Sequence, residues 1–499
     1  MELTGATVFL ISLASVVILA SLLSRKLAPS SKNRRPPGPW RLPLIGNLHQ
    51  IVGSQPPIVL RDMAKKHGPV MYLRLGQVDT VVVSSPSAAE EVLREKDLSF
   101  ASRPNLLVAE ISFYGNTDIA MTPYGAYWRT LRKICTVELL SERKVRQFSP
   151  VRDNETMSLV SNVGEACSGG KPFNLGRLII SCSNCIIAKA AFGDKCSSEL
   201  EEQFLSAMEV VLKLSGALCI GDLFPSLRFV DVLTGLTGRI WRARRQQDKA
   251  LDKMISQSKM RPGDHLLGIL LRIRDEGDLD FPMEMDNVKA IIMDMFTAGT
   301  ETTSSAAEWA MSELVRNPEV MAKAQAEVRR AFHDKNTQDH EEHVVELHYT
   351  KMVIKEALRL YPVVPMLIPH VCRETCELGG FQVTKGTRVM VNTWALGRNP
   401  EYWHEPEEFR PERFKDDTAN NQSLRFDYLP FGGGRRKCPG DTFGLATLHL
   451  MVARLLYYFD WSLPAGVKPS ELDMEMRVGM TLRRKNQLHL VATPYKACS

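Results

Sequence analysis

The residues with the clearest chemical potential surround one cysteine near the C-terminus. Residues 431–440 read Phe-Gly-Gly-Gly-Arg-Arg-Lys-Cys-Pro-Gly, so three glycines and three cations precede Cys438. Glycines have no side chain, so they let a backbone lie close to a flat, bulky group. Neighbouring cations are expected to favour the thiolate over the thiol. A thiolate in this setting acts as a metal ligand or as a nucleophile.

The surrounding sequence fits neither a zinc site nor a hydrolase. Zinc needs further Cys or His at ligand spacing, and none accompanies Cys438. A nucleophilic cysteine needs a histidine base, and His404 and His449 belong to no recognisable pattern. One thiolate is sufficient for an iron porphyrin. The His-Glu-Glu-His stretch at 340–343 lacks the spacing of a zinc protease and is expected to be a solvated loop.

A long helix, expected over 286–317, has to position the remaining chemistry. It ends before Pro318, as helices do. Residues 298–303 near its middle read Ala-Gly-Thr-Glu-Thr-Thr, and such small and hydroxyl residues are poor choices inside a buried helix. A local rule broken within a regular element often marks function. Thr302 and Glu301 are therefore candidate catalytic residues.

The cysteine segment resembles the haem-binding signature of the cytochrome P450 family, F-x-x-G-x-R-x-C-x-G, with matches at Phe431, Gly434, Arg436, Cys438 and Gly440. Other segments resemble the family in the same order along nearly the whole chain: W-x-x-x-R at 128–132, A-G-T-E-T-T at 298–303, E-x-x-R at 356–359 and P-E-R-F at 411–414. The implied fold is mainly α with a small β part, in a single haem-binding domain.

The resemblance assigns a role to each matching position. Cys438 would be the axial ligand of the iron of haem b. The cofactor contacts would be Trp128, Arg132, Ala298, Gly299, Phe431, Gly434, Arg436, Cys438 and Gly440, with the arginines pairing with the haem carboxylates. Thr302 and Glu301 would relay protons. A charge network supporting the cysteine loop would comprise Glu356, Arg359 and Arg413. In one departure from the family, His370 stands where an arginine often meets a haem propionate, so we assign it no such role; Arg373 would compensate only in a different strand register.

Within the family the chain is most similar to the plant A-type clan, and to its terpenoid-oxidising branch. The residues expected to face the substrate are mostly apolar, which fits a hydrocarbon-like ligand. They are Met293, Val363, Met366, Leu367, Ile368 and Met480. The segment 105–124 is expected to close the pocket. An alkaloid or a flavonoid or other phenolic is the alternative substrate.

Electrons have to come from another protein, because the chain has no Gly-rich dinucleotide or flavin motif. The resemblance implies an NADPH–cytochrome P450 reductase, docking on a face made positive by Arg129, Lys133, Arg435 and Lys437. Two other classes of haem protein are alternatives to a monooxygenase. Reductase-independent isomerases and dehydratases commonly lack the helix threonine, and a haem sensor needs no proton relay. Thr302 with Glu301 therefore favours a monooxygenase that uses O₂.

The N-terminus predicts a membrane address. Residues 3–24 carry no charged side chain and are long enough to cross a bilayer as a helix, and Arg25 and Lys26 follow at once. The positive flank places the rest of the chain in the cytosol. We therefore expect a transmembrane anchor at 3–24, a basic and Pro-rich hinge at 25–40 and a monooxygenase domain at 41–499. The predicted location is the endoplasmic reticulum membrane, single-pass. A net charge of +6 is too weak to indicate nucleic acid binding, and the ten scattered cysteines are not expected to form a disulfide framework.

Overall fold

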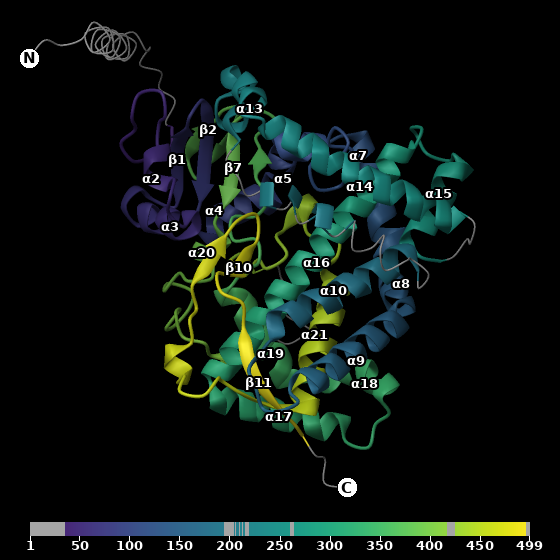
Figure 1. Cartoon of the computed structure of the whole chain (residues 1–499). Coiled ribbons are helices and arrows are strands. Elements are labelled where there is room, and N and C mark those ends of the chain that lie inside the picture. The colour runs from purple at the N-terminus through teal and green to yellow at the C-terminus, as the bar shows by residue number, and fades with distance from the viewer. Residues whose placement is uncertain are drawn as a thin grey trace, which may run out of the picture.

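A computed structural model describes residues 35–193, 219–259, 264–416 and 425–495, together with residues 204, 206–208, 210, 211, 213 and 214. The predicted anchor at 3–24 and most of the hinge at 25–40 lie outside this part of the chain. The described part is mainly helical with a small β region (Figure 1), so the predicted fold class is confirmed.

Helices make up most of the molecule. The α-helices are α2 (Leu48–Ile51), α3 (Pro56–His67), α4 (Pro86–Glu90), α5 (Asp97–Phe100), α6 (Leu107–Ser112), α7 (Ala126–Lys133), α8 (Glu142–Gln147), α9 (Ser149–Ala166), α10 (Leu175–Phe192), α12 (Ile220–Leu223), α13 (Phe229–Leu233), α14 (Leu236–Lys259), α15 (Leu266–Glu276), α16 (Met285–Arg316), α17 (Pro318–Phe332), α18 (His340–His343), α19 (His348–Leu360), α20 (Thr393–Leu396) and α21 (Asp441–Tyr458). Two π-helical turns, η1 (Glu91–Glu95) and η2 (Ile134–Leu139), extend α4 and α7. The 3₁₀ turns are η3 (Pro225–Leu227), η4 (Thr337–Asp339), η5 (Val344–Glu346), η6 (Pro411–Phe414), η8 (Gly434–Arg436) and η9 (Pro469–Glu471).

The strands form one four-stranded sheet and three smaller ones. They are β1 (Val70–Leu75), β2 (Val78–Val83), β3 (Phe173–Asn174), β4 (His370–Val371), β5 (Cys376–Leu378), β6 (Phe381–Val383), β7 (Arg388–Val391), β8 (Phe459–Ser462), β9 (Met476–Val478), β10 (Leu482–Arg484) and β11 (His489–Pro494). In the largest sheet the order is β1-β2-β7-β4, with β2 and β7 parallel. The edge strand β4 of this sheet contains His370, which lines the buried cavity beside α16.

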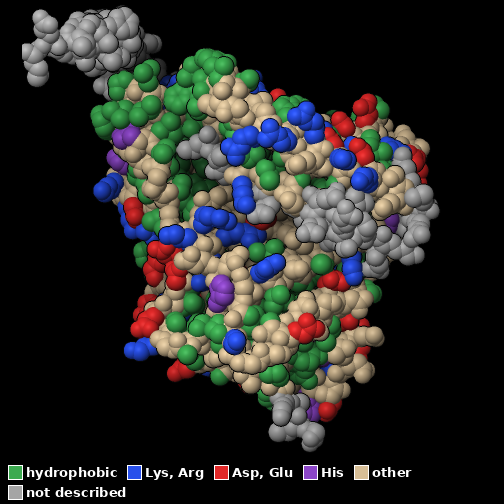
Figure 2. Space-filling view, viewed as in Figure 1, with side chains coloured by type: hydrophobic (Ala, Val, Ile, Leu, Met, Phe, Trp, Pro, Cys, Tyr) green, Lys and Arg blue, Asp and Glu red, His purple; other side chains and the backbone are tan. Residues whose placement is uncertain are grey.

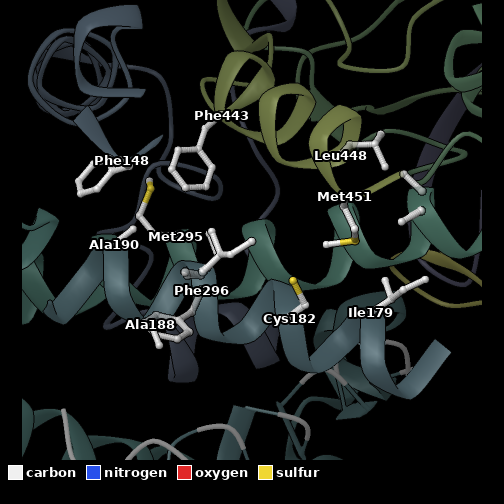
Figure 3. Packing of buried hydrophobic residues seen from close by; sticks show 14 of the residues in the cluster. Phe148, Ile179, Cys182, Ala188, Ala190, Met295, Phe296, Phe443, Leu448 and Met451 are labelled. Carbon is white, nitrogen blue, oxygen red and sulfur yellow. The ribbon is translucent and has the colours of Figure 1, made fainter. Parts of the chain in front are cut away.

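The central helix α16 is the axis of the core. It starts at a capping box between Glu284 and Asn287 and ends before Pro318. It packs most closely against α10, and α21 lies against its other side (Figure 3). Buried apolar side chains from the three helices, including Phe296, Ile179 and Met451, form one continuous cluster. Helix α16 therefore has little freedom to move, and the side chains in its middle are held in place.

Helix α10 also bears on the membrane prediction. Among the described residues it alone is long and apolar enough to cross a bilayer, but most of it is buried in the core. Its two cysteines form no disulfide with a described residue; Cys182 is buried and Cys185 is half-buried. We therefore interpret α10 as a core helix.

The prediction of a solvated loop at 340–343 was wrong. These residues form the short helix α18. The His340 ring is buried and stacks on Phe332 at 4.1 Å, and Glu341 pairs with the buried Arg152. The charged composition hid this packing, because the Glu341 carboxylate is neutralised by Arg152, which is far away in the sequence. No group of three or more possible metal ligands occurs among the described residues.

Candidate active site

A buried cavity lies between α16 and the loop that precedes α21. Its floor is the cysteine loop, from Pro430 to Gly440, and its opposite wall is the middle of α16. The α16 residues in the lining are Asp294, Met295, Ala298, Gly299, Thr302, Thr303 and Ala306. Their spacing of three and four residues means that a single face of α16 lines the cavity.

The cysteine loop is closed by its own backbone. The Cys438 N–H donates to the Phe431 carbonyl at 2.9 Å, and Lys437 N–H donates to Gly434. The expectation that neighbouring cations lower the pKa of Cys438 is wrong for the protein alone: burial raises it, outweighing the opposing effects of the Gly440 N–H, Arg132 and Lys437. The Lys437 ammonium is already paired with Asp441 at 2.7 Å. Metal coordination itself deprotonates a thiol.

The glycines of this loop and of the first turn of α21 are of two kinds. A Cβ on Gly434, at φ +63°, would lie 2.0 Å from the Leu93 carbonyl oxygen, so protein packing requires glycine there, and Gly434 is absent from the cavity lining. By contrast, a Cβ on Gly440 or Gly444 would approach no protein atom closer than 3.8 Å. Protein packing does not require glycine at these two positions, and both line the cavity. They leave the floor flat, as a planar ligand needs.

The two candidate proton-relay residues face different ways. Thr302 lines the cavity, and its hydroxyl donates to the Ala298 carbonyl at 2.5 Å. Glu301 is outside the lining and accepts from Arg483 Nε at 2.6 Å, towards β10. Adjacent helix residues are 100° apart, so one can border the cavity while the other reaches the opposite side of the helix.

The structure corrects half of the predicted substrate-facing set. Val363, Leu367 and Ile368 line the cavity, with Val364 beside them. Met293, Met366 and Met480 do not. Met293 is fully buried in the large core cluster; Met366 packs against β1 and β2; and Met480 is 41% exposed in the turn between β9 and β10.

Cationic side chains gather at one edge of the cavity. Arg132 is half-buried, lines the cavity and has no ion-pair partner among the described residues. Arg436 also lines it, but donates to the carbonyls of Ala101, Ile119 and Thr122. Trp128 lies under Arg436 at 4.2 Å, and its indole N–H donates to Ile119 at 3.0 Å. The Trp128 donor is thus used within the protein, whereas the Arg132 guanidinium is available for an anion.

Two residues of this edge were not identified from the sequence. Arg103 is buried and donates through Nε and Nη1 to backbone carbonyls, while its Nη2 has no hydrogen-bond partner within the described chain. Burial lowers the pKa of Arg103. His370 is buried in the lining, and Nδ1 bonds to the Phe100 carbonyl at 2.8 Å, leaving Nε2 for a ligand. Burial, with help from Arg103, lowers the pKa of His370. Arg373 is exposed and bonds to Leu98, so it does not compensate for His370.

These features fit haem. The flat glycine floor carries one thiol, and Arg103, Arg132, Arg436 and His370 stand at one edge of the cavity, where the two carboxylates of haem would lie. Uncompensated buried cations are costly, so an anionic group at this edge would relieve the cost. Ala298 and Gly299 line the wall opposite Cys438, and Phe431 lines the floor.

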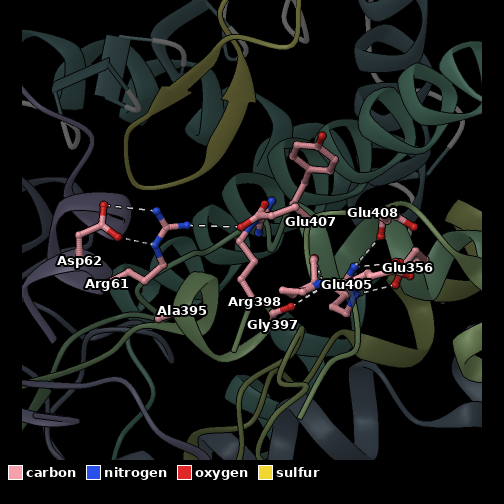
Figure 4. A network of polar contacts seen from close by, with 12 residues as sticks. Arg61, Asp62, Glu356, Ala395, Gly397, Arg398, Glu405, Glu407 and Glu408 are labelled. Atoms are coloured by element: carbon pink, nitrogen blue, oxygen red, sulfur yellow. Dashed lines mark hydrogen bonds and ion pairs between the residues drawn. The ribbon is translucent and has the colours of Figure 1, made fainter. Parts of the chain in front are cut away.

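A network of ion pairs centred on the buried Glu356 carboxylate connects α19 with the segment that follows α20 (Figure 4). Arg359 donates to both carboxylate oxygens of Glu356, at 2.7 and 2.8 Å, and Arg413 donates to the same carboxylate at 2.8 Å. Arg359 also donates to the carbonyls of residues 397, 406 and 408. The network therefore fixes the segment 397–413 against α19. The Tyr428 ring packs at a tilt against the Phe414 ring, with the centroids 5.2 Å apart, and so connects this segment to the start of the cysteine loop.

The predicted docking cations lie around the same loop. Arg129 and Lys133 are exposed on α7 and form no ion pair within the described residues. Arg435 pairs with Asp97 at 3.2 Å and Lys437 with Asp441. Arg129 and Arg435 both lie over the ring of Tyr124. The free positive charge of this face therefore comes mainly from α7.

Comparison with known proteins gives a consistent result. The sequence profile described as Cytochrome P450 matches residues 36–491. A rice protein (Oryza sativa subsp. japonica) named 9-beta-pimara-7,15-diene oxidase is 61% identical over 494 residues, 99% of this chain and 98% of its own length. Premnaspirodiene oxygenase of Hyoscyamus muticus is 47% identical, covering 97% and 98%.

A solved structure shares the fold. A zebra fish cytochrome P450 determined with progesterone superposes with a TM-score of 0.76 at 26% identity, covering 89% of this chain and all of the other.

Proposed function

The chain belongs to the cytochrome P450 family, and we propose that it is a membrane-anchored monooxygenase that oxidises a small terpenoid hydrocarbon. It is an oxidoreductase with haem b as its cofactor. The observation that carries the proposal is the cavity, where one thiol, the two threonines of α16 and an otherwise mainly apolar wall meet.

Haem bound through a thiolate supplies the cleavage of the O–O bond of dioxygen. The chain's own residues do the rest. Cys438 is held by the closed loop, and Arg103, Arg132 and Arg436 orient the cofactor through its carboxylates. Thr302 holds a hydroxyl at the cavity, where proton delivery is needed. Val363, Val364, Leu367 and Ile368 exclude water and offer an apolar surface to the substrate.

The substrate class rests on two supports. The side chains on the wall above the floor are apolar apart from the α16 threonines and Asp294. The relatives over nearly full length include proteins named for oxidising pimaradiene, premnaspirodiene and 5-epiaristolochene. We therefore assign a terpene hydrocarbon as the substrate. Each round of oxidation inserts one oxygen atom, and one substrate molecule can pass through several rounds. A phenolic is the second candidate substrate, because the relatives also include a protein named desmethyl-deoxy-podophyllotoxin synthase, at 44% identity, whose name is not that of a terpene oxidase.

The electron donor is an NADPH–cytochrome P450 reductase. We assign its docking site to the face of Arg129 and Lys133, which form no ion pair with a described residue. An acidic partner surface would be attracted to it.

Residues 3–24 anchor the protein in the endoplasmic reticulum membrane, and residues 25–40 connect this anchor to the domain at 41–499. An exposed apolar patch supports this arrangement. It consists of Trp40, Leu44, Val52, Phe229, Val232, Leu233 and Trp241. The patch lies near the β1–β2 turn, because Gly46 forms a β-bridge with Leu75 there and the Gln77 N–H donates to the Leu223 carbonyl (Figure 2). It is next to residue 35, where the described chain begins. Exposed apolar patches of this kind mark membrane or partner contacts.

The test is reconstitution of the full-length protein in microsomes with a plant reductase and NADPH. Candidate substrates are 9-beta-pimara-7,15-diene, a sesquiterpene hydrocarbon and a phenolic. We expect a red-shifted thiolate-type band in the reduced carbon monoxide spectrum, absent in Cys438→Ser, and an oxygenated terpene product that requires NADPH. Turnover of the phenolic alone would overturn the substrate class, and a missing band would overturn the haem-thiolate assignment.

A further inference from the structure

Two buried carboxyl groups meet at the loop that supports the edge of the cavity. Asp294 is on α16 and lines the cavity, and Asp118 is in the segment between α6 and α7. Their exposed fractions are 5% and 0%. Neither forms an ion pair of 4 Å or less with a described cation, which is unusual for buried acids.

The carboxyl groups hold the backbone of residues 118–122, which we call the edge loop. The N–H groups of Ile119 and Ala120 donate to Asp294 Oδ2 at 2.7 and 3.1 Å. The Met121 N–H donates to Asp118 Oδ2 at 2.9 Å. Asp118 Oδ1 is buried and has no donor among the described residues.

The carbonyl groups of the edge loop hold the cofactor-facing side chains. The Ile119 carbonyl accepts from Trp128 and from Arg436, and the Thr122 carbonyl accepts from Arg436 at 2.6 Å. The Ala120 carbonyl accepts from Arg103 at 3.1 Å. The two acids thus hold the edge loop by accepting hydrogen bonds from its N–H groups. The edge loop in turn holds three cavity side chains, which donate hydrogen bonds to its carbonyl groups.

We propose that Asp294 and Asp118 share one proton, and that this neutral-and-charged carboxyl pair is the positioning device that fixes Arg103, Trp128 and Arg436 at the edge of the haem site. A proton on Asp294 supplies the donor that Asp118 Oδ1 lacks. One charge remains on the pair, and it faces Arg103 and Arg436. The proposal rests on the haem assignment above.

The surrounding electrostatics agree with a shared proton. Burial raises the pKa of Asp294 well above its usual value, and the neighbouring Asp118 charge raises it further. Burial also raises the pKa of Asp118, to about 6. The other titratable groups near the pair remain neutral near pH 7, because burial raises the pKa of Cys135 and of Tyr127 to about 12. The directions of these shifts agree with a single proton held by the pair.

The sign of the pH dependence follows. When the edge loop detaches, Asp294 reaches water and regains an ordinary carboxyl pKa. At any pH between the ordinary pKa of Asp294 and its raised pKa in the folded protein, detachment of the edge loop releases a proton. Detachment therefore becomes more favourable as the pH rises through this range. The rate of haem loss should rise by up to about tenfold per pH unit across this range.

The experiment measures haem transfer from the haem-loaded, detergent-solubilised full-length protein to apomyoglobin between pH 6.5 and 8.5. Asp294→Asn keeps an acceptor for the two N–H groups and donates to Asp118, so it should keep the slow wild-type rate at pH 6.5 and lose the rise with pH. Asp118→Asn should likewise be tolerated, because its amide donates to an ionised Asp294. Asp294→Ala should lose haem at least tenfold faster at pH 6.5.

Asp231→Asn is the matched control. Asp231 is buried and accepts two backbone N–H bonds, from Ile220 and Gly221, but lies outside the cavity lining. It should leave the pH slope unchanged. If Asp294→Asn retains the wild-type slope, or loses haem as fast as Asp294→Ala, the shared proton is refuted. The carbon monoxide spectrum separates this failure from that of the proposed function, because a wild type without a thiolate-type band would refute the latter instead.

Discussion

Arg483 and Glu301 form an ion pair, with Nε 2.6 Å from the carboxylate, on the side of α16 that faces β10. The next residue, Thr302, lines the cavity. A proton taken up at Glu301 therefore has to cross the helix to reach the cavity. Thr302 is the group in direct contact with the reaction space, and Glu301 acts from behind it.

Thr302→Ala should therefore uncouple the enzyme. We expect product formed per NADPH to fall by about a hundredfold, the lower end of the range for proton-transfer groups. Hydrogen peroxide should account for much of the NADPH consumed. Thr302→Ser keeps the hydroxyl and serves as the control, with coupling close to wild type. Glu301→Gln should have a smaller effect than Thr302→Ala, and the opposite order would show that Glu301 itself reaches the cavity.

Removing Glu356 should abolish the folded haem protein. Glu356→Ala leaves the buried Arg359 without its carboxylate, and breaking a buried ion pair on one side costs about 3–5 kcal/mol. The measurement is thermal unfolding, together with the yield of the thiolate-type band. Lys323→Ala is the control, because Lys323 and Glu412 form an exposed pair, and such pairs contribute about 0–1 kcal/mol. Equal losses in the two variants would contradict the supporting role of the network.

Much of this architecture could be predicted from the sequence where the signal is local. The helix expected at 286–317 is α16, with each end within one residue. Glu356, Arg359 and Arg413 meet as the motif resemblance implies. Side-chain direction was harder to predict. Met293 and Met295 differ by 200° around α16, and Met295 is the one that lines the cavity.

Residues brought in by tertiary packing gave no local signal. Arg103 and His370 reach the cavity because the segment after α5 lies against the edge strand β4. Asp294 is one acid in an otherwise apolar helix stretch, and only its contact with Ile119 and Ala120 shows what it does. The pKa of Cys438 was misjudged because charge can be counted in a sequence, whereas burial cannot.

The two positive-φ glycines of the cysteine loop should differ in their tolerance of alanine. Gly434→Ala would place a Cβ 2.0 Å from the Leu93 carbonyl oxygen. Both clashing groups belong to the backbone, so neither can move aside without disturbing the fold. We expect no thiolate-type band and little soluble protein. Gly432 has φ +67° but only Leu367 nearby, at 3.7 Å, so Gly432→Ala should cost only about 1–2 kcal/mol of backbone strain. Similar yields of haem protein from the two variants would refute the packing argument.

Reversing the charge of α7 should slow the reductase without disturbing the haem site. Arg129→Glu/Lys133→Glu removes the two unpaired cations of the docking face, and electrostatic steering contributes tenfold or more to association rates, about 10–10³. We expect the first electron transfer to slow by about tenfold at low ionic strength, and the difference from wild type to shrink at high salt, where charges are screened. The carbon monoxide spectrum should be unchanged. Lys385→Glu/Arg477→Glu, at exposed cations on other elements, is the control for a general effect of net charge. If this control slows the first electron transfer equally, the reductase does not bind the α7 face, and the docking site lies elsewhere on the protein.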